Sequence, residues 1–254
     1  MKKLNRRLKQ LAFCLCMLAM LTSSTASQLC YAGTTKGTFV ANMKFDSNCL
    51  SKTDKEIFSK ATKKLKGVKY TPIAVIGQQV VAGYNLEYLC KATTLDRKRT
   101  SSLKVMVIFS SPDYKKCKVI STKKFDPAKI KTCKYESNFI PLSGGWQEYC
   151  FLKKATLPKN VAKALTSADK KYADKNFKPI AFLGTRTSSS VSYTILCVGI
   201  ANKGEVTIKT AQPTLHVPGM SFNPSSLDIV TVTQSAKGKA TIKSVKHLDI
   251  HAYR

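Results

Sequence analysis

Three histidines and nine cysteines are the side chains of this 254-residue chain best suited to covalent or metal chemistry. All three histidines, His216, His247 and His251, lie near the C-terminal end of the sequence. His247 and His251 have the i, i+4 spacing of zinc ligands, but the glutamate of a zinc-protease motif is missing, and we expect both in an exposed chain end. No cysteine has the C-G-S-C-W type of surrounding that marks a nucleophile. The sequence therefore predicts no enzyme, no metal site and no cofactor.

Non-covalent binding is the chemistry suggested by five consecutive residues, Gln79, Val80, Val81, Ala82 and Gly83. The two valines and the alanine offer a compact apolar surface that a dry cleft can bury, at about 25 cal/mol per Å². Gln79 can hydrogen-bond a cleft wall or brace its own loop, and Gly83 permits a positive φ. The alternative is an ordinary hairpin whose valines pack inward. Three apolar residues in succession break the alternation that a buried strand keeps, which favours an exposed loop.

Cysteine usage and the N-terminus together indicate export. Basic residues precede a short apolar run, Leu11 to Leu21, as in a signal peptide. Cleavage after Ala26 would leave seven cysteines, whereas cleavage after Ala32 leaves an even set suited to disulfides. The six that remain are Cys49, Cys90, Cys117, Cys133, Cys150 and Cys197. We therefore predict a signal peptide over residues 1–32, a secreted or periplasmic product and no transmembrane segment.

The chain is strongly basic, with 43 Lys and Arg against 14 Asp and Glu and a formal net charge of +29. Such a field attracts polyanions of any kind. The lysines are spread singly and in pairs along the whole chain, without zinc-finger spacing, an Arg-rich arm or an aromatic-interleaved motif. The charge therefore predicts nonspecific polyanion binding and no specific nucleic-acid partner.

An internal repeat supplies the elements that must position the Gln79 to Gly83 segment. Residues 70–77 align without gaps with residues 177–184 at a shift of 107, and the same shift pairs Cys90 with Cys197. Further on the shift grows to 124, so the second copy carries an insert. The insert includes Ala211 to Ser225, and its prolines and glycine indicate a loop.

Each copy begins with a helical pattern and continues with strands. The apolar stripes are Ile57, Phe58, Ala61 and Leu65 in the first copy and Leu157, Val161, Ala164, Leu165, Ala168 and Tyr172 in the second. Ser51 or Thr53 is the expected N-cap and Gly67 the stop signal. Downstream, Tyr84, Leu86, Tyr88 and Cys90 alternate with Asn85, Glu87 and Lys91. Period two predicts antiparallel strands with one face under the helix and one face in water.

These patterns predict an α+β protein of two domains, each with one long helix packed on a four- to five-stranded antiparallel sheet. The domains are expected over residues 33–135 and 136–254. Repeat symmetry predicts disulfides Cys49–Cys90 and Cys150–Cys197, which leaves Cys117–Cys133. Six cysteines allow fifteen connectivities, and free buried thiols are the alternative.

The segment Gln79-Val80-Val81-Ala82-Gly83, placed after a helix and a first strand, resembles the Q-x-V-x-G signature of the cystatin and stefin inhibitors of papain-like cysteine proteases. The resemblance implies two cystatin-like domains, the first bearing the motif and the second a degenerate loop, Arg186 to Ser190. It also implies that the first hairpin loop enters the protease cleft as a reversible wedge. Because no scissile peptide meets the nucleophile, binding without turnover is expected.

The resemblance implies further protease contacts outside the motif. Cystatins carry a glycine ahead of the helix, and Gly37 is nearer the expected spacing than Gly33; its alternative is a flexible tail. Pro112 and Tyr114 stand where many secreted cystatins place Pro-Trp, and their alternative is a plain turn. The segment Ser143-Gly144-Gly145-Trp146 is similar to the glycine-rich start of some cystatins, but we interpret it as a linker glycine pair with a packing tryptophan.

We therefore expect a secreted inhibitor of papain-like cysteine proteases with one inhibitory site per chain. The alternative is a non-inhibitory binding protein of the same fold for polyanions, peptides or cell surfaces. The dependence of binding on ionic strength distinguishes the two functions. Polyanion binding weakens steeply as ionic strength rises, whereas binding through an apolar plug does not.

Overall fold

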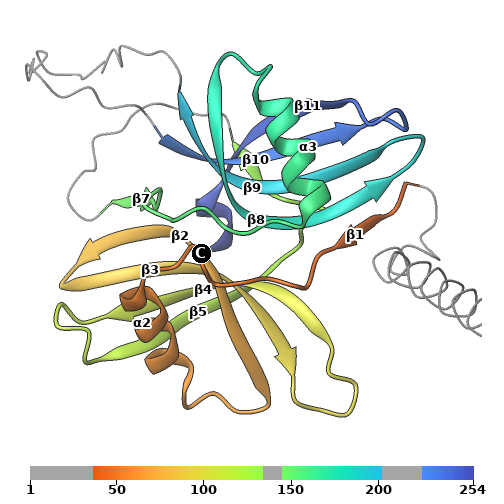
Figure 1. Ribbon diagram of the computed structural model, residues 1–254. Coiled ribbons are helices and arrows are strands. Elements are labelled where there is room, and N and C mark those ends of the chain that lie inside the picture. Colours follow the sequence, from red (N-terminus) through yellow and green to blue (C-terminus); the bar gives the residue numbers. More distant parts are fainter. Residues whose placement is uncertain (1–36, 134–144, 202–224) are drawn as a thin grey trace, which may run out of the picture. The chain divides into compact units, whose positions relative to one another are not determined.

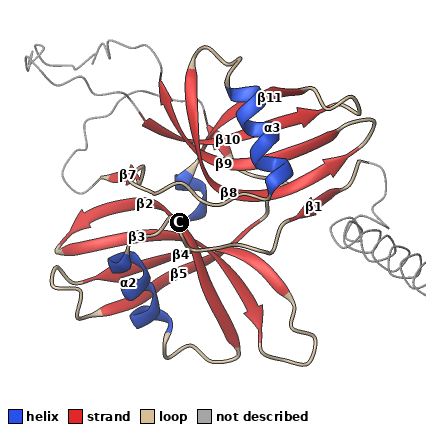
Figure 2. Ribbon diagram, in the orientation of Figure 1, coloured by secondary structure: helices blue, strands red, loops and turns tan. Residues whose placement is uncertain are grey.

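A computed structural model describes residues 37–133, 145–201 and 225–254 (Figure 1). The predicted signal peptide and all of the predicted insert except Ser225 lie outside these ranges. Phe39–Arg254 forms one compact unit. Strands make up most of it, 51% against 14% helix, and Figure 2 shows them as two groups of antiparallel arrows.

The first sheet has five antiparallel strands in the order β5-β4-β3-β2-β7. Their bounds are Cys117–Phe125 (β5), Ser101–Ser110 (β4), Gly83–Thr94 (β3), Val68–Val81 (β2) and Trp146–Glu148 (β7). The β2–β3 hairpin is very tight, because Val81 pairs with Gly83 and only Ala82 stands between them. Strands β4 and β5 are joined by a hairpin turn that contains Pro112.

The second sheet has six antiparallel strands in the order β1-β8-β9-β10-β11-β6. Their bounds are Phe39–Ala41 (β1), Lys175–Thr187 (β8), Val191–Ala201 (β9), Ser225–Gln234 (β10), Ala240–Leu248 (β11) and Thr132–Cys133 (β6). A short 3-10 helix, η1 (Ile250–Tyr253), follows β11. Strands β10 and β11 are joined by a hairpin turn around Lys237.

One short helix packs on each sheet, α2 (Lys52–Thr62) on the first and α3 (Lys159–Asp169) on the second. Helix α2 starts at the predicted N-cap Ser51, whose hydroxyl accepts a hydrogen bond from the Asp54 amide while the Asp54 carboxylate accepts one from the Ser51 amide, each at 3.1 Å. This capping box fixes the start of the helix. Helix α3 buries Val161, Ala164, Leu165 and Ala168.

The two repeats exchange their first strands. At the repeat shift of 107, Phe39 is equivalent to Trp146, and β1 is therefore the counterpart of β7. Phe39 pairs with Arg186 in β8, and Trp146 pairs with Gln79 in β2, which is the equivalent position of the other repeat. Each short strand thus completes the sheet of the opposite repeat, and in doing so pairs an edge that would otherwise expose unpaired backbone groups.

The segments that follow the last strands cross over in the same way. Strand β6, which comes after β5, pairs with β11 of the second sheet. After β11, the ring of Tyr253 lies 5.2 Å from that of Phe125 in β5, and its hydroxyl accepts a hydrogen bond from the Lys131 amide at 2.9 Å. The unit is therefore held by reciprocal crossovers at both ends of each repeat.

Central strands are buried on both faces. In β3, Tyr88 and Cys90 alternate with Glu87 and Leu89, and all four are 0% exposed. The Phe58 ring of α2 packs edge-on against Tyr88 at 5.1 Å. The opposite face joins a core cluster to which both sheets contribute. The predicted wet face is therefore wrong at Glu87, because other parts of the unit cover it.

The predicted fold class, α+β with two cystatin-like domains each built from one long helix on a four- to five-stranded sheet, is wrong. The fold is mostly β, and each helix has 11 residues. Leu65, expected at the end of the first helical stripe, lies beyond α2 and is 41% exposed. Six strands form the second sheet because crossover strands from the first repeat complete it. Whether residues 33–135 and 136–254 are separate domains stays a prediction.

The predicted disulfides are not formed in this structure. Cys49, Cys90, Cys117, Cys150 and Cys197 are free thiols, and each predicted pair contains at least one of them. Cys117 lies in β5 of the first sheet, whereas Cys133 pairs with His247 at the edge of the second. The strand crossovers thus place these two cysteines in different sheets. In the described ranges, every helix is too short or too polar to cross a membrane.

Replacing Gly184 with alanine should loosen the crossover strand β1. A Cβ at this position would meet the Val40 carbonyl oxygen and lie 2.5 Å from the Phe39 ring. We expect Gly184→Ala to lower the free energy of unfolding by about 1–3 kcal/mol. Exchange of the Asn42 amide, which donates to the Leu183 carbonyl at 2.8 Å, should also become faster.

The control is Ser189→Ala in the exposed turn that follows β8, which should leave both quantities unchanged. Urea unfolding and amide hydrogen exchange measure the two effects. Equal stability and equal Asn42 protection in Gly184→Ala and the unmutated protein would refute the packing that we describe for β1.

Candidate protein-binding site

The Gln79 to Gly83 segment forms the tip of the β2–β3 hairpin. Val80 and Val81 are 50% and 40% exposed, and Ala82 is exposed as well. The Gln79 side-chain oxygen accepts a hydrogen bond from the Asn85 side chain at 2.8 Å across the base of the tip. The side-chain amide of Gln79 therefore braces the hairpin, and the apolar residues beyond Gln79 face solvent.

Gly83 is the residue that makes the tip narrow. Its φ of +135° is a conformation that other residues rarely adopt, and a Cβ there would collide with the Ser110 carbonyl oxygen. A Cβ would also lie 3.1 Å from the Phe109 ring. Glycine thus lets β3 begin directly against β4, which brings the β4–β5 loop close to the hairpin tip.

The β4–β5 loop, Ser111 to Lys116, lies beside the hairpin tip. The Asp113 carboxylate accepts hydrogen bonds from the Ser111 hydroxyl at 2.6 Å and from the Lys115 amide at 3.1 Å. These bonds lower the pKa of Asp113. Tyr114 has a φ of +58°, is 38% exposed and stacks on Tyr84 with ring centroids 6.1 Å apart. The loop is therefore ordered by its own polar contacts and presents an aromatic ring next to the tip.

The structure brings together several of the predicted binding residues at one end of the first sheet. Val80 and Val81 end strand β2, Pro112 and Tyr114 lie in the β4–β5 loop, and all four are exposed. Gly37 has a φ of +89°, but β1, which begins two residues after it, pairs with β8 of the second sheet.

Trp146 lies beside the hairpin tip. It pairs with Gln79 through β7, and the Arg254 guanidinium lies 4.4 Å from the centre of its ring. Arg254 also approaches the buried Glu87 carboxylate, at 3.7 Å. Burial raises the pKa of Glu87 to about 7 although Arg254 opposes this effect. The predicted role of Trp146 as a packing residue is consistent with these contacts.

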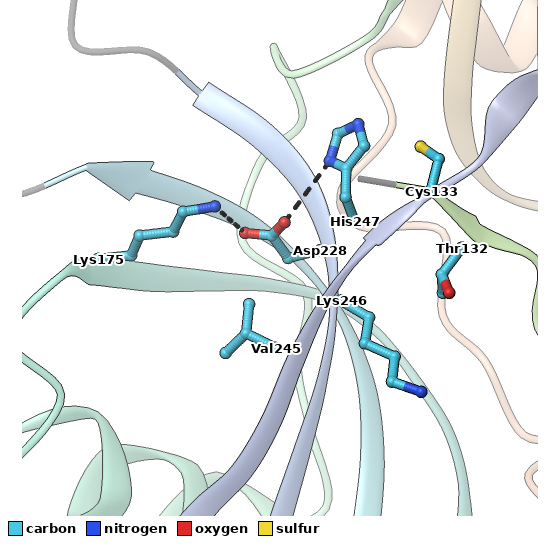
Figure 3. A pocket seen from close by; sticks show the side chains of 7 residues that line it. All are labelled: Thr132, Cys133, Lys175, Asp228, Val245, Lys246 and His247. Carbon is cyan, nitrogen blue, oxygen red and sulfur yellow. Dashed lines mark hydrogen bonds and ion pairs between the residues drawn. The ribbon is translucent and has the colours of Figure 1, made fainter. Parts of the chain in front are cut away.

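A second concentration of functional groups lies in the second sheet, where Lys175, Asp228 and His247 form a buried chain of charges. Figure 3 shows Lys175 and His247 pointing at Asp228 from opposite sides. The Asp228 carboxylate is 2.9 Å from the Lys175 ammonium and 3.7 Å from His247 Nδ1. On its other nitrogen, His247 contacts Glu148 at 2.5 Å, and Glu148 also accepts a hydrogen bond from the Leu227 amide at 2.9 Å. Positively and negatively charged side chains thus alternate along this row of contacts.

Burial and these partners act against each other on the pKa values. Burial alone would lower the pKa of His247, but the contacts with Asp228 and Glu148 outweigh it and raise the pKa from 6.5 to about 9. Burial would raise the pKa of Asp228, but hydrogen bonds from His247, Lys175 and Ser226 leave it below its ordinary value. The expectation of an exposed, frayed His247 is therefore wrong, because strand β11 places this residue inside the fold, where 12% of its side chain is exposed.

A cavity of about 520 Å³ borders this charge chain and is lined by Thr132, Cys133, Lys175, Asp228, Val245, Lys246 and His247. The lining cations Lys175 and His247 already donate to carboxylates. Within the part of the chain that the structure describes, His, Cys, Asp and Glu form no group suited to a metal ion. The charge chain therefore supports a structural role, linking β7 to β10 and β11.

The sequence patterns did not indicate that Phe109 and Tyr84 lie at the hairpin tip. They also did not indicate that His247 pairs with Glu148. The repeat shift of 107 contains one usable signal, since it aligns Phe39 with Trp146 and so marks β7 as a strand equivalent to β1. Nothing in the pattern indicates the crossover itself.

Compared with known protein families the chain matches no family model, and a search of curated proteins finds no similar sequence. The site must therefore be interpreted from its own geometry.

Raising the pH through 9 should destabilise the fold through His247. The pKa of His247 is higher in the folded than in the unfolded chain, so its stabilising contribution is complete below pH 6.5 and is lost as the pH rises through about 9. The loss corresponds to roughly 3 kcal/mol at most. Desolvation raises the pKa values of the Cys49, Cys90 and Cys150 thiols to about 12, so these thiols also favour unfolding above pH 9.

The comparison with His247→Gln isolates the histidine from the thiols. Urea unfolding between pH 6 and pH 10 should give a steeper loss of stability for the unmutated protein than for the variant. Parallel curves would show that His247 carries no excess proton in the folded state.

Proposed function

We propose that this protein inhibits papain-like cysteine proteases by inserting the β2–β3 hairpin tip into the active-site cleft. The observation that supports this most is the outward position of Val80 and Val81 at a braced, one-residue turn. Valines folded under α2 would have removed the basis for the proposal. The chain lacks the fold that the cystatin resemblance implied, so the proposal depends on the loops and not on the architecture.

The tip has the physical properties of a plug. Its apolar side chains lose contact with water when a cleft covers them, and the Gln79 brace limits the conformational entropy that binding must remove. Gly83 keeps the tip thin enough to enter a narrow groove. A rigid, tight turn offers no extended peptide to the nucleophile, so the protease binds it without cleaving it.

The neighbouring loop extends the binding surface. Tyr114 and Tyr84 form an aromatic pair next to the tip, and aromatic side chains are enriched at the centres of protein interfaces. Pro112 is exposed in the same loop. The β2–β3 and β4–β5 loops lie at the same end of the first sheet and can therefore contact the two walls of a cleft.

The proposed setting is outside the cytoplasm, which rests on the predicted signal peptide over residues 1–32. We propose that the protein acts as a binding partner without enzymatic activity of its own. This agrees with the residues at the tip, none of which is a nucleophile or a general base.

The decisive experiment is a titration of papain with the protein from residue 33 onward. We expect inhibition at micromolar concentration or below. The double variant Val80→Asp/Val81→Asp should weaken it by at least about 100-fold, because it replaces two apolar contacts by charges that the cleft must desolvate. Both positions are solvent-exposed, so the variant should fold normally.

The matched control is Thr187→Asp/Ser188→Asp, which places the same two charges at the equivalent positions of the β8–β9 hairpin. It should inhibit like the unmutated protein. The proposed function fails if the unmutated protein leaves both papain and a cathepsin fully active at micromolar concentration.

A further inference from the structure

We infer that the target protease carries carboxylates around its cleft, because the apolar tip of this protein is surrounded by lysines. This inference rests on the proposed function and adds to it the chemical class of the partner. It is carried by the positions of Lys60, Lys115, Lys116 and Lys118, which we call the basic rim.

One side of the basic rim comes from α2 and the β4–β5 loop, which meet beside the tip. Lys60 of α2 donates a hydrogen bond to the Tyr114 carbonyl at 2.9 Å, which places its ammonium against the β4–β5 loop. Lys115 and Lys116 belong to that loop, and both are exposed. Three positive charges therefore lie next to the Tyr84–Tyr114 pair.

On the opposite face, Lys118 extends the basic rim. Its ammonium lies 5.8 Å from the centre of the Phe109 ring, and Phe109 is the ring against which Gly83 packs. Positive charge thus flanks the hairpin tip on both faces of the first sheet.

Asp113 is the acidic residue of the loop, and its carboxylate already makes contacts within the loop. It accepts hydrogen bonds from Ser111 and from the Lys115 amide, and it forms an ion pair of 3.6 Å with the Lys115 ammonium. Because both members of this pair are largely exposed, the pair is weak and the loop keeps its positive field.

An apolar centre with a charged rim is the arrangement in which burial supplies affinity and charge supplies rate and partner choice. A cleft with acidic edges gains from this field, since long-range attraction speeds association. A cleft with basic edges meets repulsion from every lysine of the rim. The rim therefore selects among proteases that share the same catalytic chemistry.

The test measures association rate constants with two papain-like proteases, one with an excess of carboxylates around its cleft and one with an excess of lysine and arginine. At low salt, Lys115→Glu/Lys116→Glu should slow association with the acidic-rimmed protease by about 10-fold, and added salt should shrink the difference. The same variant should speed association with the basic-rimmed protease.

The matched control is Lys237→Glu/Lys239→Glu, which makes the same charge change in the β10–β11 hairpin, the counterpart of the β4–β5 hairpin. It should alter either rate less than about twofold. Equal effects of the two variants would mean that only net charge matters and would overturn the inference. Absence of inhibition of both proteases by the unmutated protein would instead remove the proposed function.

Discussion

The structure depends on one constraint, the need to pair the outer edges of the long strands β2 and β8. Strand β2 leads into the hairpin of the proposed site, and β8 leads into the equivalent hairpin of the second repeat. Each strand would otherwise expose unpaired backbone groups. The chain satisfies both edges reciprocally: β1 pairs with β8, and β7 pairs with β2. Because the exchange occurs at equivalent registers, neither repeat holds its complete sheet without the other. The buried contacts of Glu148 with His247 and Leu227 lock the same crossover.

This constraint also explains the geometry of the hairpin tip. Strand β7 pairs with β2 only from Gly77 to Gln79, so β2 is held on both sides up to the residue that precedes Val80. Beyond Gln79 the pairing with β7 ends, and Val80 and Val81 pair with β3 alone. The crossover from the second repeat therefore acts on the site by fixing its base, while the residues that would touch a protease all come from the first repeat.

Local features were predictable from the sequence, whereas contacts between the repeats were not. Ser51 as N-cap, the hairpins around Pro112 and Lys237 and the outward Val80 follow from short-range patterns that leave few alternatives. The buried state of Glu87 and the position of His247 depend on how the two sheets pack together. Sequence periodicity does not indicate this packing. The repeat made two self-contained sheets the natural expectation, because sequence symmetry cannot distinguish a strand that completes its own sheet from one that completes its neighbour's.

The proposed site does not depend on the architecture that the sequence predicted. A wedge inhibitor needs a narrow apolar tip, a firm base and a surrounding field that favours its partner, and none of these requires a long helix. Here Gly83 gives the narrow tip, the Gln79–Asn85 hydrogen bond and β7 give the base, and the basic rim gives the field. The energetic cost of ordering these parts is met in folding, through the core shared by the two sheets, so that binding can use the apolar surface of the tip without first organising it.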